Sequence, residues 1–285
     1  MQFSKMHGLG NDFMVVDSIT QYVSLSSSVV RFLSDRHHGV GFDQLLLIES
    51  SDQLDVDFCY RIFNSDGQEV YQCANGVRCL AQFVHRKKLT NKSSICVATK
   101  TRRMMLFILD NEICVDMGEP EFDSKKVPLS SCLSNDSLND SFFVFIAGRE
   151  ITFWTVSMGN PHCVLIVKDV QVAEVSVLGP ILENYHYFPE RANISFMEIV
   201  SDNHIRLRVH ERGVGETRSC GSAACAAVSV GIRQGLLSHC VAVDLLGGSL
   251  MINWEGVGHS LYMYGPATHV YDGYIYISKD IGDTI

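Results

Sequence analysis

Two cysteines lie in similar local sequences, one in each half of the chain. Cys73 stands in the segment QCANG and Cys220 in the segment SCGSA, and each is followed by small or amide residues and then by an apolar helical pattern. Backbone N–H groups at a helix start lower the pKa of a neighbouring thiol and make its thiolate accessible near neutral pH. One such cysteine would suggest a nucleophile. Two of them predict a pair that faces one site and gives and takes a proton from opposite sides.

Helices that begin directly after the two cysteines would position them. Helical spacing of apolar residues predicts one helix from residue 74 to about residue 88 and another from 221 to about 234. Their buried sides are expected to carry Val77, Leu80, Phe83 and Val84 in the first helix, and Ala224, Val228 and Ile232 in the second.

The rest of the chain is predicted to be rich in β-strands. The clearest apolar runs are 13–16, 44–48, 58–63, 104–109, 113–116, 162–167, 205–210 and 274–277. The segment 117–120 (MGEP) is a predicted domain boundary, and the polar stretch 130–141 is predicted to be a loop.

The two halves of the chain resemble each other in spacing. Asn64 stands nine residues before Cys73, as Glu211 stands nine residues before Cys220. Likewise Gly-Asn precedes a predicted strand at Asn11 and again at Asn160. This pattern indicates a duplicated α/β unit.

Composition excludes several classes of partner. The 285 residues carry a formal net charge of −9, which argues against nucleic acid, and no apolar run approaches the length needed to cross a bilayer. No signal peptide is visible, so we expect a cytoplasmic protein whose ten cysteines are reduced. Those inside apolar runs are expected to be buried structural residues: Cys59, Cys96, Cys114 and Cys163.

Several separated motifs, in the right order, resemble those of the diaminopimelate epimerase family. They are MHGLGNDF at 6–13, FNSDG at 63–67, CANGVRC at 73–79, SMGNPH at 157–162, ERGVGET at 211–217 and CGS at 220–222, with further likeness at 190–194 and 270–273. The resemblance covers nearly the whole chain.

The resemblance implies a fold of class α/β (α+β) with two similar domains. Each domain would be a curved, mostly antiparallel sheet wrapped around a central helix, with the active site in the cleft where the two helix starts meet. The N-terminal domain would comprise 1–118 plus 266–285 and the C-terminal domain 119–265, because the last strand returns to the first domain. A homodimer with Tyr271 near the contact is also implied.

The family's chemistry is carried over residue by residue. Cys73 and Cys220 would be the acid–base pair, and His162 and Glu211 would tune the two thiols. The implied substrate-binding set is Asn11, Gln44, Asn64, Ala74, Asn75, Asn160, Asn193, Glu211, Arg212, Gly221 and Ser222. Carboxamides offer both donors and acceptors to ammonium and carboxylate groups, and Arg212 could fork onto a second carboxylate. The backbone N–H groups of the two helix starts would bind the carboxylate next to the reacting carbon.

One departure from the family pattern concerns two alanines. Glycine is usual in the family at the positions of Ala74 and Ala223. Ala74 keeps its N–H donor, but an alanine would be strained there if the position required a positive φ.

The implied function is the cofactor-independent interconversion of LL- and meso-2,6-diaminopimelate, which feeds lysine and cell-wall precursor synthesis. The two thiols alone suit the task, because inverting a carbon next to a carboxylate needs a base on one face and an acid on the other. Neither pyridoxal phosphate nor a metal is expected.

Four alternative functions use some of the same residues. A metal site could use Cys73, Cys79, Cys220, Cys225 and His162, but their spacing does not match zinc motifs. A thiol redox protein lacks the expected C-x-x-C motif. The third alternative is another enzyme of the same fold, either proline-racemase-like or an isomerase without the cysteine pair. The fourth is a non-catalytic amino-acid-binding module.

Overall fold

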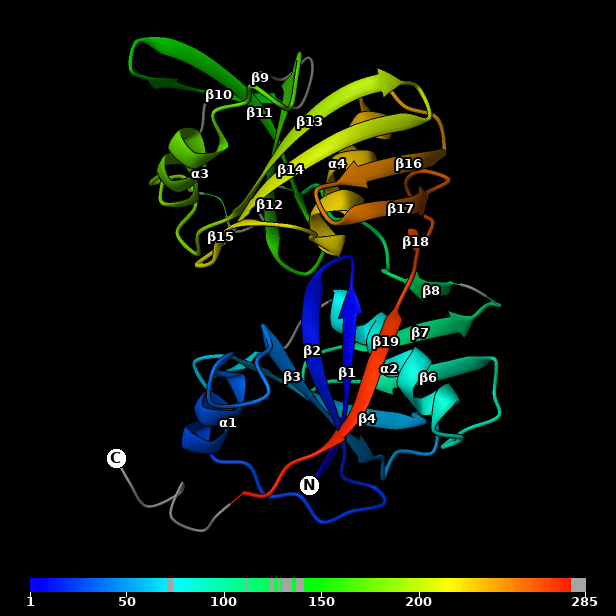
Figure 1. Ribbon diagram of the computed structural model, residues 1–285. Coiled ribbons are helices and arrows are strands. Elements are labelled where there is room, and N and C mark those ends of the chain that lie inside the picture. The colour runs from blue at the N-terminus through cyan, green and yellow to red at the C-terminus, as the bar shows by residue number, and fades with distance from the viewer. Residues whose placement is uncertain are drawn as a thin grey trace. The chain divides into compact units, whose positions relative to one another are not determined.

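The structure, a computed structural model, describes residues 1–70, 74–110, 112–123, 126–127, 129, 135–136 and 141–277 (Figure 1). The chain divides into two compact units, Met1–Val115 with Tyr264–Ile285, and Asp116–Met263. The first unit is therefore discontinuous in sequence. The predicted domain ranges stay a prediction, since compact units need not fold or function independently.

The first unit contains one mixed sheet. Its strands, in the order in which they pair, are β19 (Thr268–Tyr274), β1 (Gln2–Gly8), β2 (Asn11–Asp17), β3 (Gln44–Ser50), β4 (Phe58–Asn64), β6 (Ser94–Ala98), β7 (Arg103–Ile108) and β8 (Ile113–Asp116), with β5 (Glu69–Val70) also on β4. The β2–β3 and β4–β6 pairs are parallel, and the other pairs named here are antiparallel.

The second unit repeats this order of pairing. Its strands are β9 (Asn135–Asp136), β10 (Ser141–Ile146), β11 (Arg149–Ser157), β12 (Pro161–Val167), β13 (Asn193–Ser201), β14 (His204–Glu211), β16 (Cys240–Leu245) and β17 (Gly248–Asn253), with β15 (Gly215–Thr217) on β14 and β18 (Tyr262–Gly265) following β17 in the chain. The parallel pairs are β12–β13 and β14–β16, at the positions of β2–β3 and β4–β6. The predicted duplication is confirmed.

Each unit has a central helix against its sheet. Helix α2 (Ala74–Arg86) contacts β1, β2, β3, β7 and β19, and α4 (Gly221–Arg233) contacts β11, β12, β13 and β17. Since each helix touches strands far apart in the pairing order, each sheet curves around its helix (Figure 1). The predicted fold class, a curved and mostly antiparallel sheet around a central helix in each of two similar halves, is confirmed.

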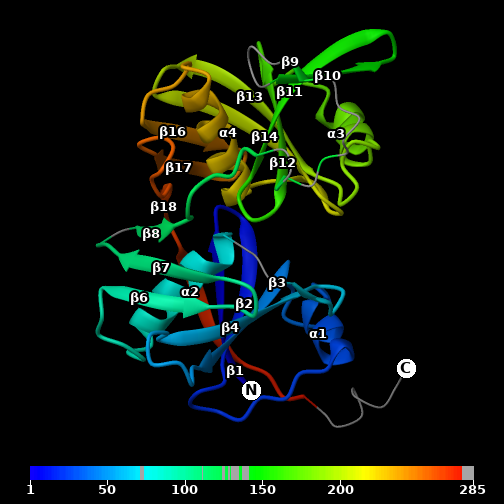
Figure 2. The same cartoon turned by 180° about the vertical axis from the view of Figure 1, so that it is seen from behind.

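A second helix in each unit makes the parallel crossover. Helix α1 (Ser27–Ser34) joins β2 to β3, and α3 (Val175–Glu183) joins β12 to β13. In the second unit, α3 packs on β13 and β14 from the face of the sheet opposite α4 (Figure 2). The side chain of Ser26 caps α1 by accepting the N–H of Val29 at 3.3 Å.

Both crossover helices pack against their sheet over an apolar layer. In the first unit, Val29, Val30 and Leu33 of α1 join a buried cluster with Met14 of β2 and Leu45 of β3. In the second unit, the corresponding cluster contains Leu178 and Leu182 of α3 together with Phe196 of β13. The crossover helices therefore bury the outer face of the strands, which leaves the strand ends for polar side chains.

Three sequence predictions differ from the structure. Helix α2 ends at Arg86, and Lys88 has a left-handed φ of 56°. The strand predicted at 274–277 is wrong, since β19 ends at Tyr274. Within the predicted loop 130–141, Asn135–Asp136 forms β9 on β10, and most of the remainder lies outside the described residues. Among the helices of the described chain, none is long and apolar enough to span a membrane.

Candidate active site

In the first unit, polar side chains lie together at one edge of the sheet, where three strands begin or end. Asn11 begins β2, Gln44 begins the parallel strand β3, and Asn64 ends β4. The register places Phe13 beside Gln44 and Gln44 opposite Asn64. The Gln44 Nε2 donates to Asn64 Oδ1 at 2.8 Å. Strand topology thus brings together three residues that are distant in sequence.

The start of α2 contacts this edge. Asn75 is buried, and its Nδ2 donates to Asn11 Oδ1 at 3.4 Å. Arg78, one turn further along, is fully buried and donates to Asn75 Oδ1 at 3.0 Å and to the Ala74 carbonyl at 3.2 Å. Arg78 therefore fixes the first turn of the helix and the direction of the Asn75 amide.

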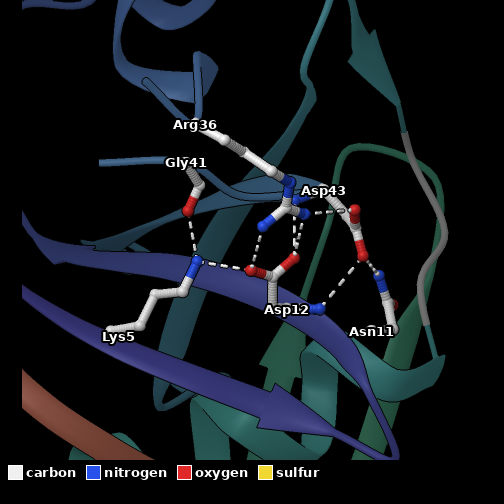
Figure 3. A network of polar contacts seen from close by, with 6 residues as sticks. All are labelled: Lys5, Asn11, Asp12, Arg36, Gly41 and Asp43. Carbon is white, nitrogen blue, oxygen red and sulfur yellow. Dashed lines mark hydrogen bonds and ion pairs between the residues drawn. The ribbon is translucent and has the colours of Figure 1, made fainter. Parts of the chain in front are cut away.

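A charged network supports Asn11 from the other side (Figure 3). Asp12 accepts two hydrogen bonds from Arg36, at 2.8 and 3.0 Å, and a third from Lys5. Asp43 accepts from Asn11 Nδ2 at 3.2 Å and from Arg36 at 2.9 Å. A carboxylate can only accept, so Asp43 sets which end of the Asn11 amide carries the nitrogen. Burial alone would raise the pKa of Asp12, but Arg36 and Lys5 outweigh it and hold that pKa well below its ordinary value.

Cys73 lies outside the described residues. Ala74, which follows it, is the first residue of α2. Ala223 is buried inside α4. Both alanines therefore belong to helices.

The second unit has the corresponding edge. Asn160 precedes β12, Asn193 begins the parallel strand β13, and Glu211 ends β14. Asn193 is buried and links two of these segments, because its Nδ2 donates to the Pro161 carbonyl at 3.3 Å and its Oδ1 accepts the Arg212 N–H at 3.0 Å. The Arg212 side chain is exposed and donates to the Glu190 carbonyl at 2.9 Å.

Cys220 is the N-cap of α4 and is 6% exposed. Its Sγ lies 3.5 Å from the Ser222 hydroxyl, and the thiol also donates a hydrogen bond to Glu211. Burial, followed by the charge of Glu211, raises the pKa of Cys220 well above its ordinary value. The sequence argument that a helix start would lower the pKa of this thiol is therefore wrong for Cys220, because burial and the nearby carboxylate outweigh the helix N–H groups.

Glu211 is the acidic partner of this thiol. Burial raises its pKa, and hydrogen bonds from the Thr217 hydroxyl and the Cys220 thiol oppose that rise. Thr217 Oγ1 donates to Glu211 Oε1 at 2.5 Å. The carboxylate is thus aimed at Cys220 by a hydroxyl on the neighbouring strand β15.

His162 is fully buried on β12. Its Nε2 lies 3.1 Å from Asn160 Oδ1, and its Nδ1 has no hydrogen-bond partner among the described residues. Burial, together with the positive charge of Arg212, lowers the pKa of His162 to about 3. The ring is neutral at physiological pH, with Nε2 as the donor toward Asn160 and Nδ1 left as an acceptor.

The first turn of α4 supplies backbone donors beside Cys220. Gly221 and Ser222 are its first two residues, and N–H groups at this position lack an acceptor within the helix. Partial positive charge there suits a carboxylate. In each unit, the carboxamide and carboxylate side chains at the strand ends therefore come first in the chain, and the start of the central helix follows them.

A statistical model of the diaminopimelate epimerase family matches residues 3–122 and 154–270. The chain belongs to the diaminopimelate epimerase family. It is accordingly an enzyme of the epimerase or isomerase type that acts on a small molecule.

Solved structures share the fold of this family member at low identity. A hydroxyproline epimerase from Agrobacterium vitis with bound trans-4-hydroxy-L-proline has a TM-score of 0.67 and 12% identity over 96% of this chain and 91% of that chain. A phenazine biosynthesis protein of the PhzF family from Bacillus anthracis has a TM-score of 0.65 and 18% identity over 97% and 99% of the two chains. These likenesses establish the fold alone.

Other predicted residues fall outside the two edges. Tyr271 lies on β19, and its ring meets the Phe3 ring edge-on, with 6.0 Å between the two ring centroids. Cys79 and Cys225 are buried within α2 and α4. Within the described ranges, no group of three or more His, Cys, Asp or Glu side chains is arranged to hold a metal ion.

Sequence reasoning missed the residues that support the site. Asp43, Arg36 and Arg78 hold Asn11 and Asn75, and Thr217 holds Glu211. Asp43 directly precedes Gln44, and Thr217 ends the motif ERGVGET. For Asp43, Arg78 and Thr217, the available signal was a position inside a quoted motif or next to a predicted site residue, and Arg36 had no such signal.

Proposed function

We propose that this member of the family interconverts LL- and meso-2,6-diaminopimelate without a cofactor, using Cys73 and Cys220 as the acid–base pair. The observation that carries the proposal is the hydrogen-bonded pair of Glu211 and Cys220 at the start of α4. A buried thiol beside a carboxylate can donate a proton and then take one up again, and an epimerase needs both steps.

The raised pKa of Cys220 favours the role of acid for this thiol in the proposed mechanism. In the proposed step, the Cys73 thiolate takes the proton from the α-carbon, and the electron pair of that C–H bond moves toward the substrate carboxylate. The Cys220 thiol then donates its proton to the opposite face of the carbon. Cys73 ends as a thiol and Cys220 as a thiolate, and exchange with solvent after product release resets both. The reverse reaction follows the same steps backward.

Charge that develops on the substrate carboxylate needs donors. The N–H groups of Gly221 and Ser222 in α4, and of Ala74 and Asn75 in α2, are proposed to supply them. Donors that are fixed before the reaction stabilise a developing anion without a reorganisation cost. Ala74 keeps its backbone N–H donor as the first residue of α2.

The substrate's second amino-acid head is proposed to bind the carboxamides and Arg212. Arg212 is exposed, its backbone is held by Asn193, and a guanidinium can fork onto a carboxylate. Diaminopimelate carries two carboxylates and two amines, whereas proline carries one of each. A second anion site therefore favours diaminopimelate over the proline-type substrate of the Agrobacterium vitis enzyme.

The remaining parts of the proposal concern the protein's setting. We propose a cytoplasmic homodimer with Tyr271, which is partly exposed on β19, near the contact. We also propose that the product serves lysine and cell-wall precursor synthesis. Sedimentation of the wild type and of Tyr271→Ala tests the dimer separately from the chemistry.

A turnover assay tests the substrate. Purified protein would be given LL-diaminopimelate, L-proline or trans-4-hydroxy-L-proline, and epimer formation would be followed by chiral chromatography. The proposal expects turnover of diaminopimelate that the Cys220→Ala variant lacks. Turnover of either imino acid in preference to diaminopimelate would assign the enzyme to a different substrate and overturn the proposal.

A further inference from the structure

A buried carboxylate outside the proposed site contacts three residues in two segments of the second unit. Glu183 is the last residue of α3 and is 5% exposed. Its Oε1 accepts the Gly213 N–H at 2.8 Å and a hydrogen bond from Arg191 Nη1 at 3.2 Å. Its Oε2 lies 2.9 Å from His210 Nε2. Both carboxylate oxygens are therefore used to hold other parts of the chain.

The three contacted residues flank the proposed site residues. His210 directly precedes Glu211, and Gly213 directly follows Arg212. Arg191 stands two residues before Asn193. The segments that Glu183 joins thus carry the thiol's carboxylate partner, the proposed anion-binding arginine and the asparagine that holds that arginine's backbone.

The backbone at one of these contacts has an uncommon conformation. Arg191 has a φ of 59°, which is costly for a residue with a side chain, whereas Gly213 adopts its φ of 74° without that cost. The approach of α3 is also close, because a Cβ added at Gly179 would lie 2.6 Å from the His210 ring. Glycine at this position lets α3 pack against His210, and one helical turn later Glu183 reaches the loop.

We propose that Glu183 is a positioning residue for the reaction, which fixes the 210–213 turn and the 191–193 segment so that Glu211 and Arg212 are correctly placed. The inference rests on the proposed function. Glu183 itself does not touch the reacting groups. Its role is distinct from that of an ordinary helix anchor, because its contacts with Gly213, Arg191 and His210 lie next to the proposed site residues and not in the apolar layer beneath α3.

The decisive variant is Glu183→Gln, which keeps the shape of the side chain. A carboxamide is uncharged and has one accepting oxygen where the carboxylate has two. The contact with His210 therefore survives only if that ring presents Nε2 as an acceptor, and the contacts with Gly213 and Arg191 lose the strengthening effect of the charge. Misplacement of binding and catalytic groups by about 1 Å can cost 10²-fold. We expect kcat/KM for diaminopimelate to fall by about 10- to 100-fold, with faster hydrogen–deuterium exchange in a peptide spanning 210–216 and unchanged exchange in α4.

The matched control is Glu174→Gln on the same helix. Glu174 is the N-cap residue of α3 and pairs with Arg149 on the surface, away from the 210–213 turn. We expect this variant to keep wild-type kinetics and wild-type exchange at 210–216. If the proposed function itself is wrong, the wild type will not turn over diaminopimelate. That result differs from a loss of turnover in Glu183→Gln alone.

The inference is overturned if folded Glu183→Gln protein keeps kcat/KM within twofold of the wild type, or if exchange at 210–216 is unchanged. If that variant does not fold, Arg191→Gln decides. It removes one contact to Glu183 from a residue whose side chain is half exposed and leaves the contact with Gly213 intact. A smaller loss of kcat/KM, with faster exchange at 210–216, supports the role, and wild-type behaviour in both measurements rejects it.

Discussion

The Glu211 carboxylate accepts a hydrogen bond from the Cys220 thiol across the junction between the end of β14 and the start of α4. Cys220 is buried and Glu211 is half-buried, and the carboxylate's charge helps to keep the proton on sulfur. The same carboxylate can receive that proton when Cys220 has to become a thiolate. The Glu211 carboxylate therefore both favours the protonated resting state of the Cys220 thiol and can accept the proton when that state changes.

Alkylation of Cys220 measures this coupling directly. At pH 7 we expect iodoacetamide to modify Cys220 slowly, with a rate that rises as the pH rises toward its raised pKa. Glu211→Gln removes the negative charge, which lowers the pKa of Cys220 and speeds its modification at a given pH. Peptide mass spectrometry follows Cys220, with the exposed Cys240 as the internal reference.

Glu216→Gln is the control for that experiment. Glu216 pairs with Arg208 on the neighbouring strand β14. Its variant should alkylate as the wild type does. Equal rates for Glu211→Gln and the wild type across pH 6–9 would contradict an electrostatic coupling between Glu211 and Cys220.

The two-base mechanism predicts a labelling pattern in D2O. Deuterium should enter mainly the product epimer, while recovered substrate is labelled slowly, because the base that removes a proton does not return one to the same face. Substrate that is labelled as fast as product forms would instead indicate one base that serves both faces. Mass spectrometry of the separated epimers early in the reaction distinguishes the two patterns.

Removal of either thiol should abolish epimerisation. General acid–base groups contribute about 10²- to 10⁴-fold, so Cys73→Ala and Cys220→Ala should each lose at least that factor in kcat. Cys220→Ser should be nearly as severe, since a hydroxyl is a much weaker acid than a thiol. The double variant should be little worse than either single variant, because the two groups act as a unit. A single variant with near-normal turnover would remove that cysteine from the mechanism.

Asp12 is expected to link stability to pH. Asp12→Asn should lower the free energy of unfolding at pH 7 by roughly 2 kcal/mol, because charged hydrogen bonds from Arg36 and Lys5 are lost. The native pKa of Asp12 is lowered, so its contribution is present above the ordinary value of 3.8 and is lost as the pH falls below it. Urea unfolding at pH 7 and pH 3 should therefore show a gap between wild type and variant that shrinks in acid. The exposed Asp52→Asn is the control, and a gap independent of pH would contradict the assignment.

His162 should not titrate in the physiological range. Its pKa of about 3 predicts a ring that stays neutral from pH 8 to pH 5. Histidine ring NMR signals followed over this range, with His162 assigned by the loss of its signal in His162→Gln, test this expectation. A midpoint between pH 6 and 7 for that signal would show that the ring is not buried as described.

The sequence predicted those parts of the fold that depend on periodicity. Helical spacing located α2 and α4 to within two residues at their ends, and apolar runs located β3, β4 and β12. The strand at 274–277 failed for a long-range reason. Its alternating pattern is typical of a strand, but a strand also needs a partner that is distant in sequence, and β1 begins at Gln2, opposite Tyr274.

The chemistry of the site was only partly readable. The residue types at the strand ends were predicted from motifs, and the structure groups them at the same edge in each half. The raised pKa of Cys220 was not predictable, because it depends on burial and on Glu211, which a different element brings close. Support from Glu183 was equally hidden, since that residue belongs to a helix for which no prediction existed.

The pairing of β1 with β19 has a consequence for how the protein is made. The second unit, Asp116–Met263, is contiguous, so all of its strands have been synthesised before the ribosome reaches Thr268. The first unit begins synthesis earlier but lacks the edge partner of β1 until β19 emerges, and pairing across such a separation is slow. We therefore expect the half of the protein that is translated first to be completed last, with the exposed edge of β1 as the site most in need of protection in the nascent chain.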